Sequence, residues 1–199
     1  MLEKKLNHKI LIEKFSKANI ILNNRYFEIQ VDQSEIFNII KELKEDPNFK
    51  FDQLIDLTAI DYPSRAKRFD VIYLLLSMTL NQRLLIKTFI DQSESIESVI
   101  TIHRAADWYE RECYDLFGIQ FLNHPDLRRI MTDYNFEGHP LRKDFPLTGH
   151  TEVRYDDLEK KVVYEPVKLT QEYRNFDYMS PWEGIDNKLA GDEKSKKED

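Results

Sequence analysis

Residues 69–90 read FDVIYLLLSMTLNQRLLIKTFI, and this stretch decides the fold. Phe69–Met78 is rich in residues that favour strands, and Arg83–Ile90 shows the alternation expected of a half-buried strand. The Asn81-Gln82 pair between them is typical of a tight turn, although its turn chemistry is weaker than that of Asn-Gly. The stretch therefore predicts an antiparallel β-hairpin.

Further elements are predicted on both sides of this hairpin. Arg25–Val31 alternates polar with apolar residues, and Leu54–Ile60 has the composition of another strand. Ser34 is placed to cap a helix whose apolar residues recur at helical spacing, and Pro47 prevents that helix from continuing. Ser93–His103 is predicted to be a helix. The order of elements predicts an α+β fold, a mainly antiparallel sheet with helices on one face.

The next stretch, residues 107–118, reads DWYERECYDLFG and predicts a helix with clear ends. Asp107 with Glu110 three residues later matches a capping box, and Gly118 supplies a left-handed stop. Cys113 falls on the apolar stripe of this helix, which predicts a buried, inert thiol. Glu112 lies on a different, acidic face.

The acidic face of this helix has three interpretations. Glu112 and Asp115 are three residues apart, so they could act as paired carboxylates in acid–base chemistry. The same face could dock or orient another segment. It could also be an ordinary solvated surface, because spacing alone does not show the burial that a perturbed carboxylate needs.

Glycine and proline divide the chain. All five glycines follow residue 117, so the phosphate-binding GxGxxG and Walker loops are absent from the sequence. Five of the seven prolines follow residue 118, which favours extended, turn-rich chain there. We therefore expect an α+β domain over residues 1–120, a long extended C-terminal segment over 121–185 that wraps a partner, and a charged, disordered tail over 186–199.

Composition excludes several functions. The chain carries 29 basic and 36 acidic residues, a net charge of −7, which disfavours nucleic-acid binding. The one cysteine cannot form an internal disulfide or a thiolate cluster, and the five histidines lack the helical spacing of a metal site. No apolar run is long enough to cross a membrane, and no signal peptide is evident, so a soluble, unexported chain is expected.

Aromatic side chains and arginines are scattered through residues 128–183, outside any regular apolar pattern. Such residues cannot all be buried in a small core of their own, and they are favoured as anchors at protein interfaces. A disordered tail would contain fewer aromatic residues. The composition therefore predicts a segment that lies across another protein.

Several motifs together resemble a known family. ERECYDLFG at 110–118 and HPDLRRIM at 124–131 look like the signature of the 30 kDa subunit of the proton-pumping NADH:quinone oxidoreductase, respiratory complex I. The resemblance continues through YNFEGHPLRKDFPLTG at 134–149, VYEPV at 163–167 and YRNFDYMSPWE at 173–183. Upstream, DLTAIDYP at 56–63 and RFDVIY at 68–73 fit as well.

The resemblance implies a core subunit of the peripheral arm that binds no cofactor. FMN, iron–sulfur clusters, NADH and quinone would then belong to other subunits, and no residue of this chain would be catalytic. The chief partner would be the large 49 kDa-type quinone-site subunit. Contact with the membrane would be made only through partners, at the cytoplasmic face of a bacterial inner membrane, or at the matrix face if the chain is encoded in a mitochondrion.

The resemblance also implies a set of signature or interface residues. The acidic-face residues and Arg111 are expected to dock or orient the extended segment, and the later arginines and aromatics to anchor on the partner. The set comprises Glu110, Arg111, Glu112, Asp115, Gly118, His124, Pro125, Arg128, Arg129, Arg142, Asp144, Tyr173, Arg174, Phe176, Pro181 and Trp182. Two alternatives stay open at this point: the equivalent subunit of a membrane-bound hydrogenase-type complex, and a free-standing acid–base enzyme.

Overall fold

A computed structural model describes residues 8–16, 18–22 and 27–169 of the chain. It divides into two units, Met1–Gly149 and His150–Asp199. The elements in chain order are α1 (His8–Lys14), β1 (Asn19–Leu22), β2 (Phe27–Val31), α2 (Ile36–Glu45), β3 (Gln53–Asp61), β4 (Phe69–Ser77), β5 (Gln82–Ile90), β6 (Ser95–Glu97), α3 (Ala106–Phe117), β7 (Gln120–Leu122), β8 (Thr151–Asp156) and β9 (Lys161–Pro166).

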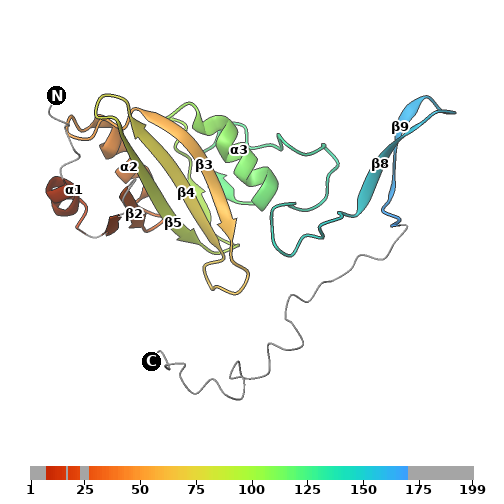
Figure 1. The fold of residues 1–199 in the computed structure, drawn as a ribbon, viewed down its shortest axis with the longest axis horizontal. Coiled ribbons are helices and arrows are strands. Elements are labelled where there is room, and N and C mark those ends of the chain that lie inside the picture. The colour runs from red at the N-terminus through yellow and green to blue at the C-terminus, as the bar shows by residue number, and fades with distance from the viewer. Residues whose placement is uncertain (1–7, 17, 23–26, 170–199) are drawn as a thin grey trace, which may run out of the picture. The chain divides into compact units, whose positions relative to one another are not determined.

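The first unit is built on a five-stranded sheet with the order β1-β2-β5-β4-β3 (Figure 1). The β4–β5 hairpin lies near its centre, with Tyr73 opposite Ile86. All neighbouring strands are antiparallel except β2 and β5, which run parallel. The prediction of an α+β fold is confirmed, and the sheet is mixed rather than wholly antiparallel.

One face of this sheet carries the core. Leu57, Tyr73 and Ile86 are register partners on three adjacent strands, and each is at most 1% exposed. Helix α2 lies behind the sheet in Figure 1 and α3 lies beside β3, and the buried apolar residues of both helices belong to the same cluster. Burial of this apolar area is the main favourable contribution to folding.

The hairpin prediction is confirmed, but the connection is a four-residue loop and not a tight turn at Asn81-Gln82. Ser77 pairs with Gln82, so the loop comprises residues 78–81. Asn81 adopts a positive φ of 50°, a conformation that asparagine tolerates better than most residues. Gln82 already belongs to the strand and takes no part in the turn.

The predicted helix over Ser93–His103 is wrong. Ser95–Glu97 forms the short strand β6 instead, which pairs in parallel with β7, and turns follow as far as the start of α3. Ile96 lies opposite Phe121, and both side chains are buried. A short apolar run rich in β-branched residues is compatible with a helix or a strand, and here pairing with β7 selects the strand.

Both predicted helix caps are also wrong. The N-cap of α2 is Glu35, and Ser34 donates its hydroxyl to Asp32 (2.9 Å) instead of capping. Helix α3 begins after Ala105 without a side-chain cap, so Asp107 lies within its first turn, and Glu110 is buried and bonded to an upstream loop. The predicted stop at Gly118 is confirmed: its φ is 77°, and its N–H bonds to the carbonyl of Tyr114.

Candidate interface around helix α3

Helix α3 packs its apolar stripe against β3 and β4. The Phe117 ring meets the Phe69 ring edge-on, with centroids 6.5 Å apart, and the Cys113 thiol donates to the carbonyl of Leu57 (3.5 Å). Burial raises the pKa of Cys113, so the thiol stays protonated and poorly nucleophilic. This position agrees with the predicted buried cysteine.

The acidic residues of α3 are not all solvated. Asp115 is completely buried, and its carboxylate accepts five hydrogen bonds from the segment after β7. Oδ2 accepts from the backbone N–H groups of Ile130, Met131 and Thr132 at 2.7–3.0 Å. Oδ1 accepts from the Thr132 hydroxyl at 2.6 Å and from the Arg129 guanidinium at 2.7 Å. One carboxylate thereby fixes the path of residues 129–132.

These bonds determine the charge of Asp115. Burial alone would raise the pKa of this carboxyl, but hydrogen bonds from the hydroxyl and N–H of Thr132, from the N–H of Met131 and from the Arg129 side chain outweigh it. The resulting pKa is about 2. Asp115 is therefore ionised at neutral pH with its lone pairs engaged, which makes it a poor proton acceptor.

The carbonyls at the end of α3 are satisfied by a second stretch of the same segment. His139 donates through Nδ1 to the carbonyl of Asp115 (2.8 Å), and the N–H of Leu141 bonds to the carbonyl of Leu116 (3.1 Å). Arg142 donates through Nε to the carbonyl of Phe117. The last carbonyls of a helix have no partners within it, so residues 139–142 act as its C-terminal cap.

Glu110 is the second buried carboxyl of α3. It accepts from the Ser98 hydroxyl (2.6 Å) and from the N–H of Val99 (2.8 Å), so it joins α3 to the loop after β6. Burial raises its pKa to about 7, against the lowering effect of these two bonds. Asp115 accepts five hydrogen bonds, whereas Glu110 accepts only these two from the described residues and also feels the negative charges of Asp107 and Glu97, so the two pKa values diverge.

His124 completes this cluster. Its Nδ1 accepts from the N–H of Asp126 (3.1 Å), which places the ring proton on Nε2. Nε2 lies 3.2 Å from the carbonyl oxygen of Asp107 and 3.9 Å from the Glu110 carboxylate. His124 therefore ties the first turn of the extended segment to the start of α3.

The remaining predicted arginines bond within the chain as well. Arg111 donates to the carbonyls of Arg128 and Arg129 at 3.1 and 3.3 Å. Arg129 also reaches the carbonyl of Gly138 (3.0 Å). Arg128 is exposed and pairs with Asp126 at 2.9 Å. Helix α3 and residues 124–142 thus form one interlocked body.

Sequence reasoning missed an ion-pair network beside this body. Asp61 is 3% exposed, pairs with Arg68 at 2.7 Å and accepts from the N–H of Lys143 at 2.7 Å. Arg68 also reaches Asp144 at 3.0 Å, so the predicted residue Asp144 is held in place from the sheet. The signal was an aspartate that directly follows the apolar run Leu57–Ile60, since a carboxylate there needs a cationic partner.

For two other predicted residues the structure gives the position and the degree of burial. Glu112 is half-buried on α3, and Pro125 is exposed in the turn after His124. The last five predictions lie outside the described residues: Tyr173, Arg174, Phe176, Pro181 and Trp182.

Exposed apolar side chains are concentrated in residues 131–169. Of the 17 large hydrophobic residues exposed among the described positions, ten fall within residues 131–169. Tyr134 is 90% exposed and Leu147 84%. In the second unit, β8 pairs with β9 as a hairpin, and it carries four more side chains that are each more than half exposed: Val153, Tyr155, Val162 and Tyr164. Such a concentration of exposed apolar surface is typical of protein interfaces.

Two further features were sought in the part of the chain that the structure describes. No cluster of three or more His, Cys, Asp or Glu side chains there is arranged to hold a metal ion. Among the same residues, no helix has the length and apolar character needed to cross a membrane.

Comparison with solved structures identifies the class of protein. The fold matches a chain of the membrane-bound sulfane sulfur reductase (MBS), an archaeal respiratory membrane complex, with a TM-score of 0.61 and 27% identity. The match covers 70% of this chain and 84% of the other. This chain thus shares its fold with a chain of a respiratory membrane complex.

Sequence comparisons narrow the class to one family. The family model for the 30 kDa subunit of respiratory-chain NADH dehydrogenase matches residues 29–151. An NADH-quinone oxidoreductase subunit of Cereibacter sphaeroides is 54% identical over 187 residues, covering 92% of this chain and 94% of that protein. The same subunit of Methylobacterium sp. is 59% identical over 166 residues, 83% of this chain and 77% of that protein. The chain belongs to the complex I 30 kDa subunit family.

Proposed function

We propose that this chain acts as a scaffold in NADH-quinone oxidoreductase and takes no chemical part in electron transfer. It would hold the subunits of the quinone-reducing module in register while electrons pass from NADH to quinone and protons are translocated. FMN, the iron–sulfur clusters, NADH and quinone would be bound by other subunits. The chain would associate with the membrane through partners, at the cytoplasmic face of a bacterial inner membrane or at the matrix face of a mitochondrial one.

The exposed apolar side chains of residues 131–169 are the observation that carries this proposal. Residues 124–169 form an arm, whose first part is pinned to α3 by Asp115 and by the cap at 139–142. Tyr134, between the two pinned stretches, and Leu147, which follows them, are almost fully exposed. These exposed apolar side chains suit an arm that binds another protein. The hydrogen bonds at its base hold the arm in place before binding, and such preorganisation lowers the entropic cost of association.

The large quinone-site subunit, the 49 kDa type, is the partner we propose for this arm. The resemblance of residues 134–149 and 163–167 to the family motifs supports this choice. A photoreactive amino acid at position 134 should couple to that subunit in the assembled complex. Coupling to a different subunit would overturn the partner assignment and leave the scaffold role intact.

The free-standing acid–base enzyme, which would use Glu112 and Asp115 as a pair, is disfavoured by the state of Asp115. Asp115 is saturated with donors and has a pKa of about 2, so it cannot serve as a base near neutral pH. The hydrogenase-type alternative is disfavoured by the relatives, because the NADH-quinone oxidoreductase subunits are 54–59% identical and the sulfane sulfur reductase chain only 27%.

The scaffold role is tested by two kinds of variant in the assembled complex. Tyr134→Asp and Leu147→Asp should release the subunit from the complex on native gels, because each places a charge in an apolar contact. Met78→Asp is the matched control, since Met78 is 59% exposed in the loop between β4 and β5, outside residues 124–169, and should assemble normally.

The second kind of variant tests the absence of a catalytic role. Glu112→Gln should leave the NADH:quinone turnover of each assembled complex unchanged. A fall in turnover with normal assembly would mean that this chain takes part in the chemistry. Normal assembly of both arm variants would show instead that the arm is not the contact surface.

A further inference from the structure

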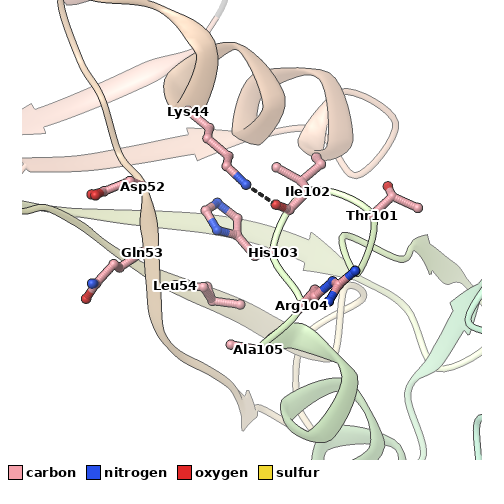
Figure 2. A pocket seen from close by; sticks show the side chains of 9 residues that line it. All are labelled: Lys44, Asp52, Gln53, Leu54, Thr101, Ile102, His103, Arg104 and Ala105. Atoms are coloured by element: carbon pink, nitrogen blue, oxygen red, sulfur yellow. Dashed lines mark hydrogen bonds between the residues drawn. The ribbon is translucent and has the colours of Figure 1, made fainter.

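A groove lies on the first unit, and all its lining residues fall within residues 37–105. Its larger part is a cavity of about 500 Å³ between the end of α2, the start of β3 and the loop 101–105 (Figure 2). A neighbouring cavity of about 280 Å³ shares Lys44 and Ile102 with it and adds Phe37 and Lys41. The two cavities together form one groove, which we call the basic groove.

An imidazole with an unsatisfied nitrogen lies in this groove. The His103 side chain points into the larger cavity, between Lys44 and Gln53 (Figure 2). The residue is 5% exposed, and its Nε2 has no hydrogen-bond partner among the residues that the structure describes. Burial and the charge of Lys44 lower its pKa to about 4, so the ring is neutral near pH 7. A buried polar nitrogen without a partner is costly, and a polar group that entered the groove would offset that cost.

Cations outnumber anions around the groove. Lys41, Lys44 and Arg104 line it, against the carboxylates of Asp52 and Glu45. Lys44 donates to the carbonyl of Ile102, and this bond is drawn in Figure 2. The side chains of Lys41 and Arg104 make no hydrogen bond or ion pair within the described part of the chain. On a chain with a net charge of −7, this is a local surplus of unpaired positive charge.

The remaining lining of the groove is apolar. Leu54 is buried beneath the larger cavity, and Phe37 and Ile102 line the smaller one. A small inorganic anion would contact the cations and leave this apolar lining in water. A peptide segment can contact both, with a carboxylate at Arg104 and Lys41 and an apolar side chain against Phe37.

We propose that the basic groove receives an acidic segment of a neighbouring subunit of the complex. The segment presents a carboxylate to Lys41 and Arg104 and an apolar side chain to Phe37. The inference rests on membership of a multi-subunit complex and not on the scaffold proposal, because the groove residues lie within 37–105 and the arm begins after residue 123. Either proposal can therefore fail without the other.

Carbodiimide coupling of the purified complex tests the groove directly. The reagent joins an amine to a carboxylate only where the two are in contact, so Lys41 or Lys44 should couple to a Glu or Asp of another subunit. The chain contains its own positive control, because Lys14 lies 2.9 Å from Glu42 and should give a coupled pair within the chain. The control product without any intersubunit product from Lys41 or Lys44 would overturn the proposal.

Charge variants supply an independent measurement. Arg104→Glu should weaken retention of the contacted subunit by about tenfold in a sodium chloride titration of the complex, since like charges then meet. Arg104→Lys should retain most of the binding, and Arg83→Glu, an exposed arginine on β5 outside the groove, should have no effect. Equal effects of Arg104→Glu and Arg83→Glu would overturn the proposal, as would recovery of a lipid or a free anion in the groove.

Discussion

The carboxylate of Asp115 has the most specific task of any single group in the site. Its two oxygens replace water for three consecutive backbone N–H groups, a hydroxyl and a guanidinium. A buried carboxylate is tolerated only when its charge is compensated in this way. The residue therefore serves to shape the chain after β7 rather than to exchange protons.

Replacing Asp115 tests this task. Asp115→Asn puts an amide donor against donors, so it should lower the free energy of unfolding by about 3 kcal/mol or more. Urea denaturation of the purified chain measures the change. Glu112→Gln, three residues earlier on a half-buried site, is the control and should stay within about 0.5 kcal/mol of the parent. Equal stability of Asp115→Asn and the parent would show that the five bonds carry no net stabilisation.

The buried carboxyl of Glu110 should make the unfolding free energy fall as the pH rises. Its pKa in the folded chain is about 7, above the ordinary value of 4.5, so folding favours the protonated form. The stabilisation is complete below pH 4.5 and is lost as pH rises through 7, a fall of about 3 kcal/mol. Glu110→Gln cannot ionise and should remove this slope from a plot of unfolding free energy against pH.

Asp115 serves as the internal contrast for this measurement. Its lowered pKa contributes stability above pH 3.8 that is lost as pH falls through about 2. The Glu110→Gln variant should therefore differ from the parent in slope between pH 4.5 and 7 and run parallel to it below about pH 4. If the plots of unfolding free energy against pH for the variant and the parent ran parallel across the whole range, the pKa of Glu110 would not be raised by folding.

At the scale of elements, the end of α3 is the junction on which the interface depends. Gly118 ends the helix in a left-handed conformation, and the space where a Cβ would lie is occupied by Arg142 and by His139, whose Nε2 would be 2.7 Å away. The glycine thus serves both the turn and the close approach of the capping segment.

Substitution at Gly118 separates the two roles. Gly118→Ala should cost about 3 kcal/mol, because it combines an unfavourable φ with displacement of Arg142 and His139. Gly118→Asn tolerates the left-handed conformation but keeps the Cβ, so it should recover little of the loss. Thermal unfolding of the two variants compares them, and full recovery with asparagine would assign the cost to backbone conformation alone.

The element predictions failed where distant chain competed with local preference. The apolar residues of Ser93–His103 suit a helix or a strand equally, and pairing with β7 selected the strand. Glu110 had the spacing of a capping box, but the N–H of Val99 and the hydroxyl of Ser98 engage its carboxylate instead. Strand β7 and the loop residues Ser98 and Val99 lie outside the predicted elements that they alter, so rules based on neighbouring residues could not take them into account.

At the scale of the whole molecule, α3 joins a sheet to an arm. Its apolar stripe is fixed by the β3–β4 side of the sheet, and its polar groups and C-terminal carbonyls are fixed by residues 124–142. The same helix therefore transmits the position of the sheet to the base of the arm. This arrangement explains why charged residues such as Asp115 and Arg129 are held in fixed positions.

Sequence by itself determined the strands of the central hairpin, the α+β class, the stop at Gly118 and the family. These follow from periodicity, glycine placement and long linked motifs, which are properties of residues close together in the chain. Tertiary structure alone decided that Asp115 and Glu110 are buried with opposite pKa shifts, that Asp61 joins Arg68 to the arm, and that His103 faces a groove. Burial and charge pairing depend on groups up to 82 residues apart, as in the bond from Lys143 to Asp61, and no local pattern encodes them.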